Sequence, residues 1–293
     1  MNGILLVDKP ADWTSHDVVQ KMRRLYETKQ VGHTGTLDPM ATGLLPICIG
    51  KATKVAEYIS DDRKAYVARA VKGIRTDTGD TTGVIYARSD ASIPKNFDGV
   101  LREFMGEQLQ LPPMHSALKY KGKKLYDYAR MGICVPRKKR PITVTKLVCI
   151  ERDGEGIRLL AEVSSGTYIR TLLDDIGVAA GCFFTMSDLR RVSVGSTTVD
   201  DAYTIEALEA MDFDERKSLL LPMDRLLDHL PPIHLPARRL KPMTNGMSSR
   251  IFFDVEKAPI YRVYAGEVFV GLGVLKEEEE DGTTNVCMKK VLV

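Results

Sequence analysis

Twelve consecutive residues decide how this chain is interpreted: Gly32-His33-Thr34-Gly35-Thr36-Leu37-Asp38-Pro39-Met40-Ala41-Thr42-Gly43. Their mixture of glycine, hydroxyl, imidazole and carboxylate follows no helical or strand period, so we expect an irregular loop. The glycines would let a ligand lie against the backbone. Pro39 favours an extended Asp38, which would present the carboxylate. The alternative is an ordinary turn in which Asp38 binds nearby backbone groups.

The sequence lacks the familiar phosphate-binding, hydrolase and metal-binding motifs. No G-x-x-x-x-G-K-[ST], G-x-G-x-x-G, H-E-x-x-H or G-x-S-x-G pattern is present. No two histidines are spaced four residues apart, so we expect no metal site. A lone carboxylate in a glycine-rich loop therefore favours one role, nucleophile or base acting on an electrophilic carbon.

The composition is that of a soluble globular protein, with 44% hydrophobic and 28% charged residues. Apolar stretches such as Ile4 to Val7 are far shorter than the roughly 18–20 residues of a membrane-spanning helix. Asp8 and Lys9 interrupt the N-terminal apolar run, so we expect no export signal. The five scattered cysteines favour reduced thiols and a cytoplasmic protein.

Positive charge is concentrated in one segment. Residues 119–140 contain nine basic residues and one acidic residue, a net charge of +8, whereas the whole chain carries +3. Such a cluster can neutralise the phosphates of a polyanion, and the interleaved Tyr120, Tyr126 and Tyr128 could stack on unpaired bases. The alternative is a solvated charge run. The candidate RNA-binding residues are Lys119, Arg130, Arg137, Lys138, Lys139 and Arg140.

Apolar periodicity and turn residues divide the chain into a large and a small domain. We expect strands over 4–7, 64–73, 143–150 and 157–163, and helices after Thr14 or Ser15, from Pro94, and over 168–180. We expect a large domain over 1–232, with an inserted, mobile segment over 111–141. Strand-like runs at 251–255, 261–264, 267–271 and 286–291 predict a β-rich domain over 233–293, and the acidic run 277–281 predicts a hairpin turn.

Several separated blocks resemble the bacterial tRNA pseudouridine synthases of the TruB type. The stretch from Gly32 to Pro39 is similar to the catalytic motif of that family. Further blocks match along residues 1–195, with weaker similarity to a PUA-like domain beyond: Asp8-Lys9-Pro10, Lys64-Ala65-Tyr66, Pro112 to Lys119, Leu125 to Arg130, Ser164 to Leu172 and Leu189-Arg190-Arg191.

The resemblance implies a role for each matched residue. Asp38 would be the catalytic aspartate and Arg170 its ion-pair partner. Tyr66 would stack on the target base, and Tyr168 and Leu189 would line the uracil pocket. His33 would fill the space that the extruded base leaves in the RNA; the alternative is a structural hydrogen bond to the loop.

Three positions depart from the family pattern. Asp12 stands where glycine is usual, and His115 stands where tyrosine is usual. Phe183-Phe184-Thr185 replaces a common Gly-Ala-His. The residues of the implied catalytic set are intact.

The resemblance also implies the fold and the reaction. The fold would be α+β, a mixed and largely antiparallel sheet with flanking helices and an RNA-gripping insertion, followed by the PUA-like domain. The enzyme would flip uridine 55 out of the T arm of tRNA and isomerise it to pseudouridine without a cofactor. We expect a monomer with tRNA as its partner and no obligate protein partner.

Two other functions would use the same residues differently. A non-catalytic RNA-binding or RNA-folding protein would need the basic segment but not Asp38. A nucleobase glycosidase would need a second carboxylate, which no motif supplies. Whether Asp38 attacks C1′, attacks C6 or acts as a base on the sugar stays open at this point.

Overall fold

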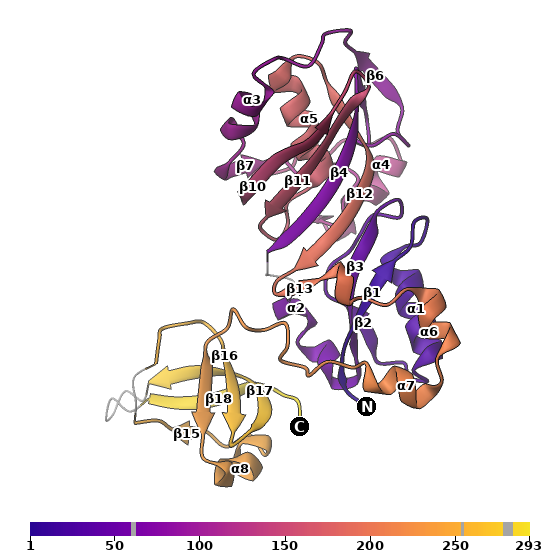
Figure 1. The fold of residues 1–293 in the computed structure, drawn as a ribbon. Coiled ribbons are helices and arrows are strands. Elements are labelled where there is room, and N and C mark those ends of the chain that lie inside the picture. The colour runs from indigo at the N-terminus through magenta and orange to yellow at the C-terminus, as the bar shows by residue number, and fades with distance from the viewer. Residues whose placement is uncertain (60–62, 253–254, 278–283) are drawn as a thin grey trace.

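The computed structural model describes residues 1–59, 63–252, 255–277 and 284–293 (Figure 1). One large sheet forms the body of the protein. Its strands lie in the order β1 (Gly3–Lys9), β3 (Thr42–Ile49), β12 (Phe184–Val194), β4 (Lys64–Lys72), β11 (Gly156–Val163), β10 (Arg140–Arg152) and β7 (Gly106–Gln110). Strand β2 (Val31–His33) pairs with β3, and β13 (Thr197–Thr198) pairs with β12.

The large sheet is mixed and mainly antiparallel. Strands β3 and β12 run parallel, whereas the other described neighbours run antiparallel. Strand β3 in this sheet is a mostly apolar run with almost no exposed side chains. The expected α+β class with a mixed, largely antiparallel sheet is confirmed.

Helices cover one side of this sheet and one end of it. Helices α3 (Phe97–Glu103) and α5 (Ile169–Ala180) lie together behind β10, β11 and β4 in Figure 1. Helix α1 (Ser15–Leu25) packs beside β2, next to α6 (Ile205–Ala210) and α7 (Phe213–Ser218). Thr14 caps α1 in a reciprocal arrangement with Asp17, and Val18, Val19 and Met22 are buried.

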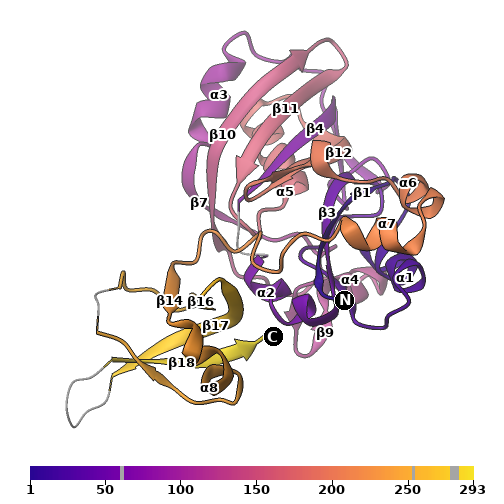
Figure 2. The same cartoon turned by 60° about the horizontal axis from the view of Figure 1, so that its bottom comes forward.

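A second sheet of five strands forms the C-terminal part. Its order is β14 (Pro232–Leu235), β16 (Tyr261–Ala265), β17 (Val268–Glu277), β18 (Thr284–Val291) and β15 (Ser249–Arg250), with helix α8 (Leu240–Thr244) beside it. Ile260, Leu272 and Leu292 share an apolar cluster with Ile4 and Leu44, so this sheet packs against the body (Figure 2). The expected β-rich C-terminal part is present. The acidic run expected to form its hairpin turn falls mainly on 278–281, outside the described residues.

Residues 111–139 connect β7 to β10, which are neighbours in the sheet. This insertion contains a two-stranded ribbon, β8 (Lys119–Tyr120) and β9 (Lys123–Lys124), followed by helix α4 (Leu125–Arg130). Arg140, expected inside the insertion, is the first residue of β10.

Three local expectations were wrong. Gly32 and His33 belong to β2, and Thr42 and Gly43 to β3, because pairing between these strands outweighs the irregular composition; the loop spans 34–41. Helix α3 begins at Phe97 rather than at Pro94, because Phe97 is the first of its residues to be buried. The expected strand over 251–255 is absent at residues 251, 252 and 255, and its other two residues lie outside the described part of the chain; β15 ends at Arg250, where its pairing with β18 ends.

Two residues at departures from the family pattern have left-handed backbone. Asp12 has φ +63° and Phe183 has φ +52°. Glycine, which the resemblance implies at both positions, would adopt such angles without steric cost. No helix in the described ranges is both long and apolar enough to cross a membrane.

Candidate active site

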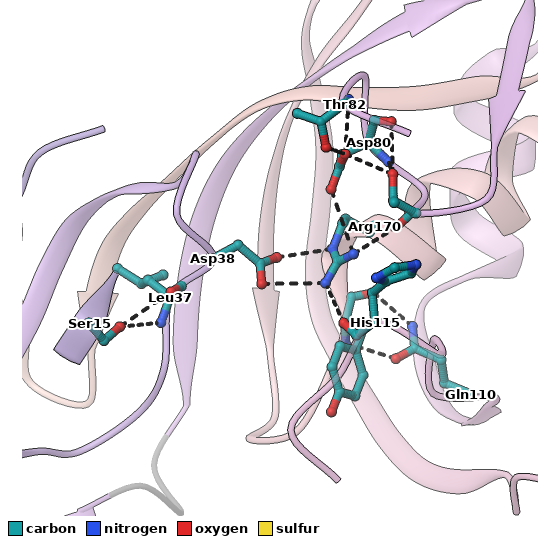
Figure 3. Close-up of polar contacts among 10 residues, drawn as sticks. Ser15, Leu37, Asp38, Asp80, Thr82, Gln110, His115 and Arg170 are labelled. Atoms are coloured by element: carbon teal, nitrogen blue, oxygen red, sulfur yellow. Dashed lines mark hydrogen bonds and ion pairs between the residues drawn. The ribbon is translucent and has the colours of Figure 1, made fainter. Parts of the chain in front are cut away.

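The loop over 34–41 is called the catalytic loop below, after the role that the resemblance implies for Asp38. It is fixed by buried side chains from other elements. Ser15, at the start of α1, accepts from Leu37 N–H at 2.9 Å and donates to Leu37 O at 3.3 Å (Figure 3). Arg191 of β12, 1% exposed, donates to the carbonyl of Gly35 at 3.2 Å. These bonds hold the backbone on the N-terminal side of Asp38.

Lys9 of β1 holds the other end of the catalytic loop. Its buried ammonium donates to the carbonyls of Pro10, Trp13 and Pro39 at 2.8, 2.6 and 3.1 Å. Burial lowers the Lys9 pKa to about 8. One side chain thus ties the catalytic loop to the turn between β1 and α1, and Asp38 has fixed backbone on both sides.

The carboxylate of Asp38 faces Arg170 in the first turn of α5 (Figure 3). Arg170 Nε lies 3.0 Å from Asp38 Oδ2, and Nη2 lies 3.4 Å from Oδ1. The Arg170 side chain is 7% exposed and that of Asp38 is 37% exposed. A ligand can therefore reach the carboxylate while its partner stays out of water, and the ion pair expected from the resemblance is present.

Arg170 has further partners that the sequence did not reveal. It donates to the carbonyls of Thr78 at 2.7 Å and His115 at 2.9 Å, and it lies 3.6 Å from Asp80 Oδ2. Asp80 accepts from the hydroxyls of Thr78 and Thr82 at 2.8 and 2.5 Å. A second, nearly buried carboxylate thus helps to orient the guanidinium. The polar turn over 76–80 was its only sequence signal.

A pocket of about 270 Å³ opens beside Asp38. Tyr66 of β4 and Leu189 of β12, both largely buried, lie in its wall, as does Tyr168 at the start of α5. Burial raises the pKa of the Tyr168 hydroxyl, which favours its neutral form. Asp38, Tyr66, Tyr168, Arg170 and Leu189 are thus brought together around one pocket. Lys64, Arg191 and residues 115–117 also line it.

His33 does not line this pocket. It lies on β2, paired in register with Ile47 of β3. Burial and the nearby charges of Arg191 and His16 lower the His33 pKa, so the ring is mainly neutral near pH 7. Any contact it makes with RNA therefore falls outside the base pocket.

The six basic residues assigned to RNA lie along the insertion and at its end. Lys119, Arg130, Lys138, Lys139 and Arg140 are exposed, whereas Arg137 is half-buried and donates to the carbonyl of Pro112 at 2.8 Å. The Tyr126 ring lies 5.2 Å from Lys124 Nζ and 5.4 Å from the Arg130 guanidinium carbon. Tyr126 thus gathers two cations. No group of three or more His, Cys, Asp or Glu side chains within the described part of the chain could hold a metal ion.

Comparison with solved structures defines the fold. The chain is similar to that in "Crystal Structure of a Cbf5-Nop10-Gar1 Complex", with TM-score 0.75 and 23% identity over 99% of this chain and 85% of that chain. It is equally similar to the "archaeal box H/ACA sRNP Nop10-Cbf5 complex", with TM-score 0.74 and 23% identity over 99% and 86% of the two chains. The body and the C-terminal sheet therefore have the fold of the matched chains in these two complexes.

Family models narrow the class to one family. "TruB family pseudouridylate synthase (N terminal domain)" matches residues 23–169, and "tRNA pseudouridylate synthase B C-terminal domain" matches residues 170–228. Proteins named tRNA pseudouridine synthase B from Enterobacter sp. (strain 638) and Aromatoleum aromaticum are each 41% identical, over 95% and 100% of this chain and 92% and 93% of their own lengths. The chain belongs to the TruB family and is an enzyme that isomerises uridine to pseudouridine.

Proposed function

We propose that this enzyme converts uridine 55 in the T arm of tRNA to pseudouridine, with Asp38 as its catalytic carboxylate and without a cofactor. The single observation that carries the proposal is the Asp38–Arg170 ion pair at the mouth of the pocket. tRNA is proposed as the substrate because the similar bacterial proteins are named tRNA pseudouridine synthase B. The choice of position 55 rests on the resemblance to that family.

The reaction breaks the bond between C1′ of the ribose and N1 of uracil. The detached base turns and rejoins C1′ through C5; the C5 proton is lost and N1 gains one, so no oxidant or reductant is needed. A carboxylate can take part at C1′, at C6 or as a base on the sugar, and Asp38 is accessible for each. Arg170 fixes its orientation through two contacts with the carboxylate oxygens.

The pocket walls suit a base that must leave the RNA stack and then turn. Tyr66 offers an aromatic face for stacking, and Leu189 and Tyr168 supply further apolar wall. Extruding the uridine costs a few kcal/mol, which contacts in the pocket and a substitute in the RNA offset. His33, outside the pocket, is our candidate for that substitute.

Charge and topology suggest how the RNA is held. The insertion and the first residue of β10 would bind the phosphates of the T arm through Lys119, Arg130, Arg137, Lys138, Lys139 and Arg140. Residues 1–232 would form the catalytic domain, and residues 233–293 a PUA-like domain with further RNA contacts. We propose a cytoplasmic monomer with tRNA as its partner.

The test uses tRNA transcript labelled with tritium at uridine C5, because joining C5 to C1′ expels the label into water. The wild type should release one equivalent per tRNA without added metal or cofactor, and Asp38→Asn should release none while still binding. Mapping the product should place pseudouridine at position 55. Tight binding without release by the wild type would overturn the proposal in favour of RNA binding alone.

A further inference from the structure

Gln110 makes two hydrogen bonds to the backbone of one pocket residue (Figure 3). Its Oε1 accepts from Tyr168 N–H at 2.8 Å, and its Nε2 donates to Tyr168 O at 3.1 Å. Gln110 is the last residue of β7 and is 4% exposed. Both bonds therefore lie within the interior, where an unpaired polar group costs about 1–3 kcal/mol. The reaction itself assigns this side chain no role.

These bonds fix the point at which α5 begins. Tyr168 is the N-cap residue of α5, and its own side chain makes no capping hydrogen bond. Its carbonyl also accepts from Leu172 N–H at 3.0 Å, the first hydrogen bond of the helix. Arg170 follows two residues later in the same turn. A shift of Tyr168 would therefore move the guanidinium relative to Asp38.

A second contact joins the same two segments. His115, which lies in the insertion five residues after Gln110, accepts from Arg170 Nη2 through its carbonyl at 2.9 Å. The segment from Gln110, at the end of β7, to His115 is thus bound to the start of α5 at two points, one at the pocket wall and one at the ion pair. The position of Arg170 relative to Asp38 therefore depends on the position of this segment.

We propose that Gln110 is a positioning residue. It fixes the backbone of Tyr168 and, through the first turn of α5, holds Arg170 against Asp38. Its loss should slow the catalytic step and leave RNA affinity unchanged, because its side chain is uncharged and buried. This inference rests on the proposed function, which supplies the reaction to be measured.

The experiment compares Gln110→Ala with the matched control Gln108→Ala. Gln108 lies two residues away on the same strand, so it points to the same side, and its amide donates to the carbonyl of Phe104 rather than to α5. Tritium release would be measured in a single turnover with enzyme in excess, and the Kd for tRNA with each variant. We expect Gln110→Ala to release label on the order of 10- to 100-fold more slowly, as a small misplacement does. Its Kd, and both properties of Gln108→Ala, should stay within about twofold of the wild type.

A second variant covers the case in which Gln110→Ala does not fold. Gln110→Glu keeps the oxygen that accepts from Tyr168 N–H but sets a second acceptor oxygen against the carbonyl of Tyr168, so it should also release label more slowly than the wild type, with unchanged Kd. Equal release by the Gln110 variants and Gln108→Ala would overturn the proposal, as would a loss found only in Kd. A wild type that releases no label would refute the proposed function itself, a result distinguishable from these.

Discussion

The catalytic loop and the insertion are both largely irregular, yet they are held in opposite ways. Buried Ser15, Lys9 and Arg191 bind the backbone of the catalytic loop from three elements. The insertion instead carries exposed cations such as Lys138 and Lys139. Fixed backbone serves a reaction that needs one geometry. Exposed charge serves a polyanion that can be gripped in several ways.

The largest effect on the reaction rate should come from substituting Arg170. Arg170→Lys keeps the charge but cannot serve Asp38, Asp80 and two carbonyls at once, because lysine lacks the planar fork. Without that fork the Asp38 carboxylate is misplaced, so single-turnover tritium release should fall on the order of 100-fold. Arg190→Lys is the control, since the Arg190–Asp8 pair lies outside the pocket; equal losses in both would contradict the prediction.

Much of this structure follows local patterns in the sequence. Strands β1, β4, β10 and β11 and helix α5 were predicted from periodicity and turn residues. A cap at Thr14 or Ser15 was predicted from residue type, and Thr14 is the N-cap. These features depend on residues that are close together in the chain, so they can be predicted from a single sequence. The C-terminal strand β15 was not predicted, because its position is set by pairing with β18, far along the chain.

The site was predicted only as far as family motifs reach. The resemblance indicated Asp38 and Arg170, which are 132 residues apart and which no periodicity could join. Asp80, Gln110 and Ser15 were missed, because each acts through a contact that exists only once the sheet has brought distant strands and helices together. Nothing in their residue types distinguishes them from ordinary polar residues.

The next effect concerns the stiffness of the catalytic loop. Lys9→Met keeps a long side chain but leaves the carbonyls of Pro10, Trp13 and Pro39 without their donor. We expect roughly tenfold slower label release, as a small misplacement gives, and unfolding free energy about 1–3 kcal/mol lower in denaturant titration. Lys21→Met removes a partly exposed ion pair with Glu209 and should change neither. A fully active, equally stable Lys9→Met would show that the catalytic loop needs no such anchor.

The insertion should respond through affinity. Replacing Lys138, Lys139 and Arg140 together with glutamine should weaken tRNA binding and flatten the dependence of log K on log salt, by roughly 0.7–0.9 for each phosphate that the variant no longer neutralises. Titration at several salt concentrations measures both. Label release under saturating enzyme should stay within about twofold of the wild type. Unchanged affinity and slope would refute an RNA-gripping role for these residues.

The smallest effect should come from substituting Tyr126 in the insertion. Tyr126→Leu removes the ring that gathers Lys124 and Arg130, an interaction of about 0.5–1 kcal/mol, so tRNA affinity should fall about two- to fivefold. Tyr126→Phe keeps the ring and should bind as the wild type does. Equal losses in both variants would assign the effect to the hydroxyl instead.

One measurement tests most directly whether the catalytic loop determines the reaction rate and the insertion determines tRNA affinity. Single-turnover release from C5-tritiated tRNA and the Kd for tRNA would be determined side by side for Arg170→Lys and for the triple insertion variant. We predict a crossed result: Arg170→Lys binds normally and reacts slowly, whereas the triple variant binds weakly and, once saturated, reacts at the wild-type rate. If both variants lose rate and affinity in the same proportion, the two regions do not have separate functions.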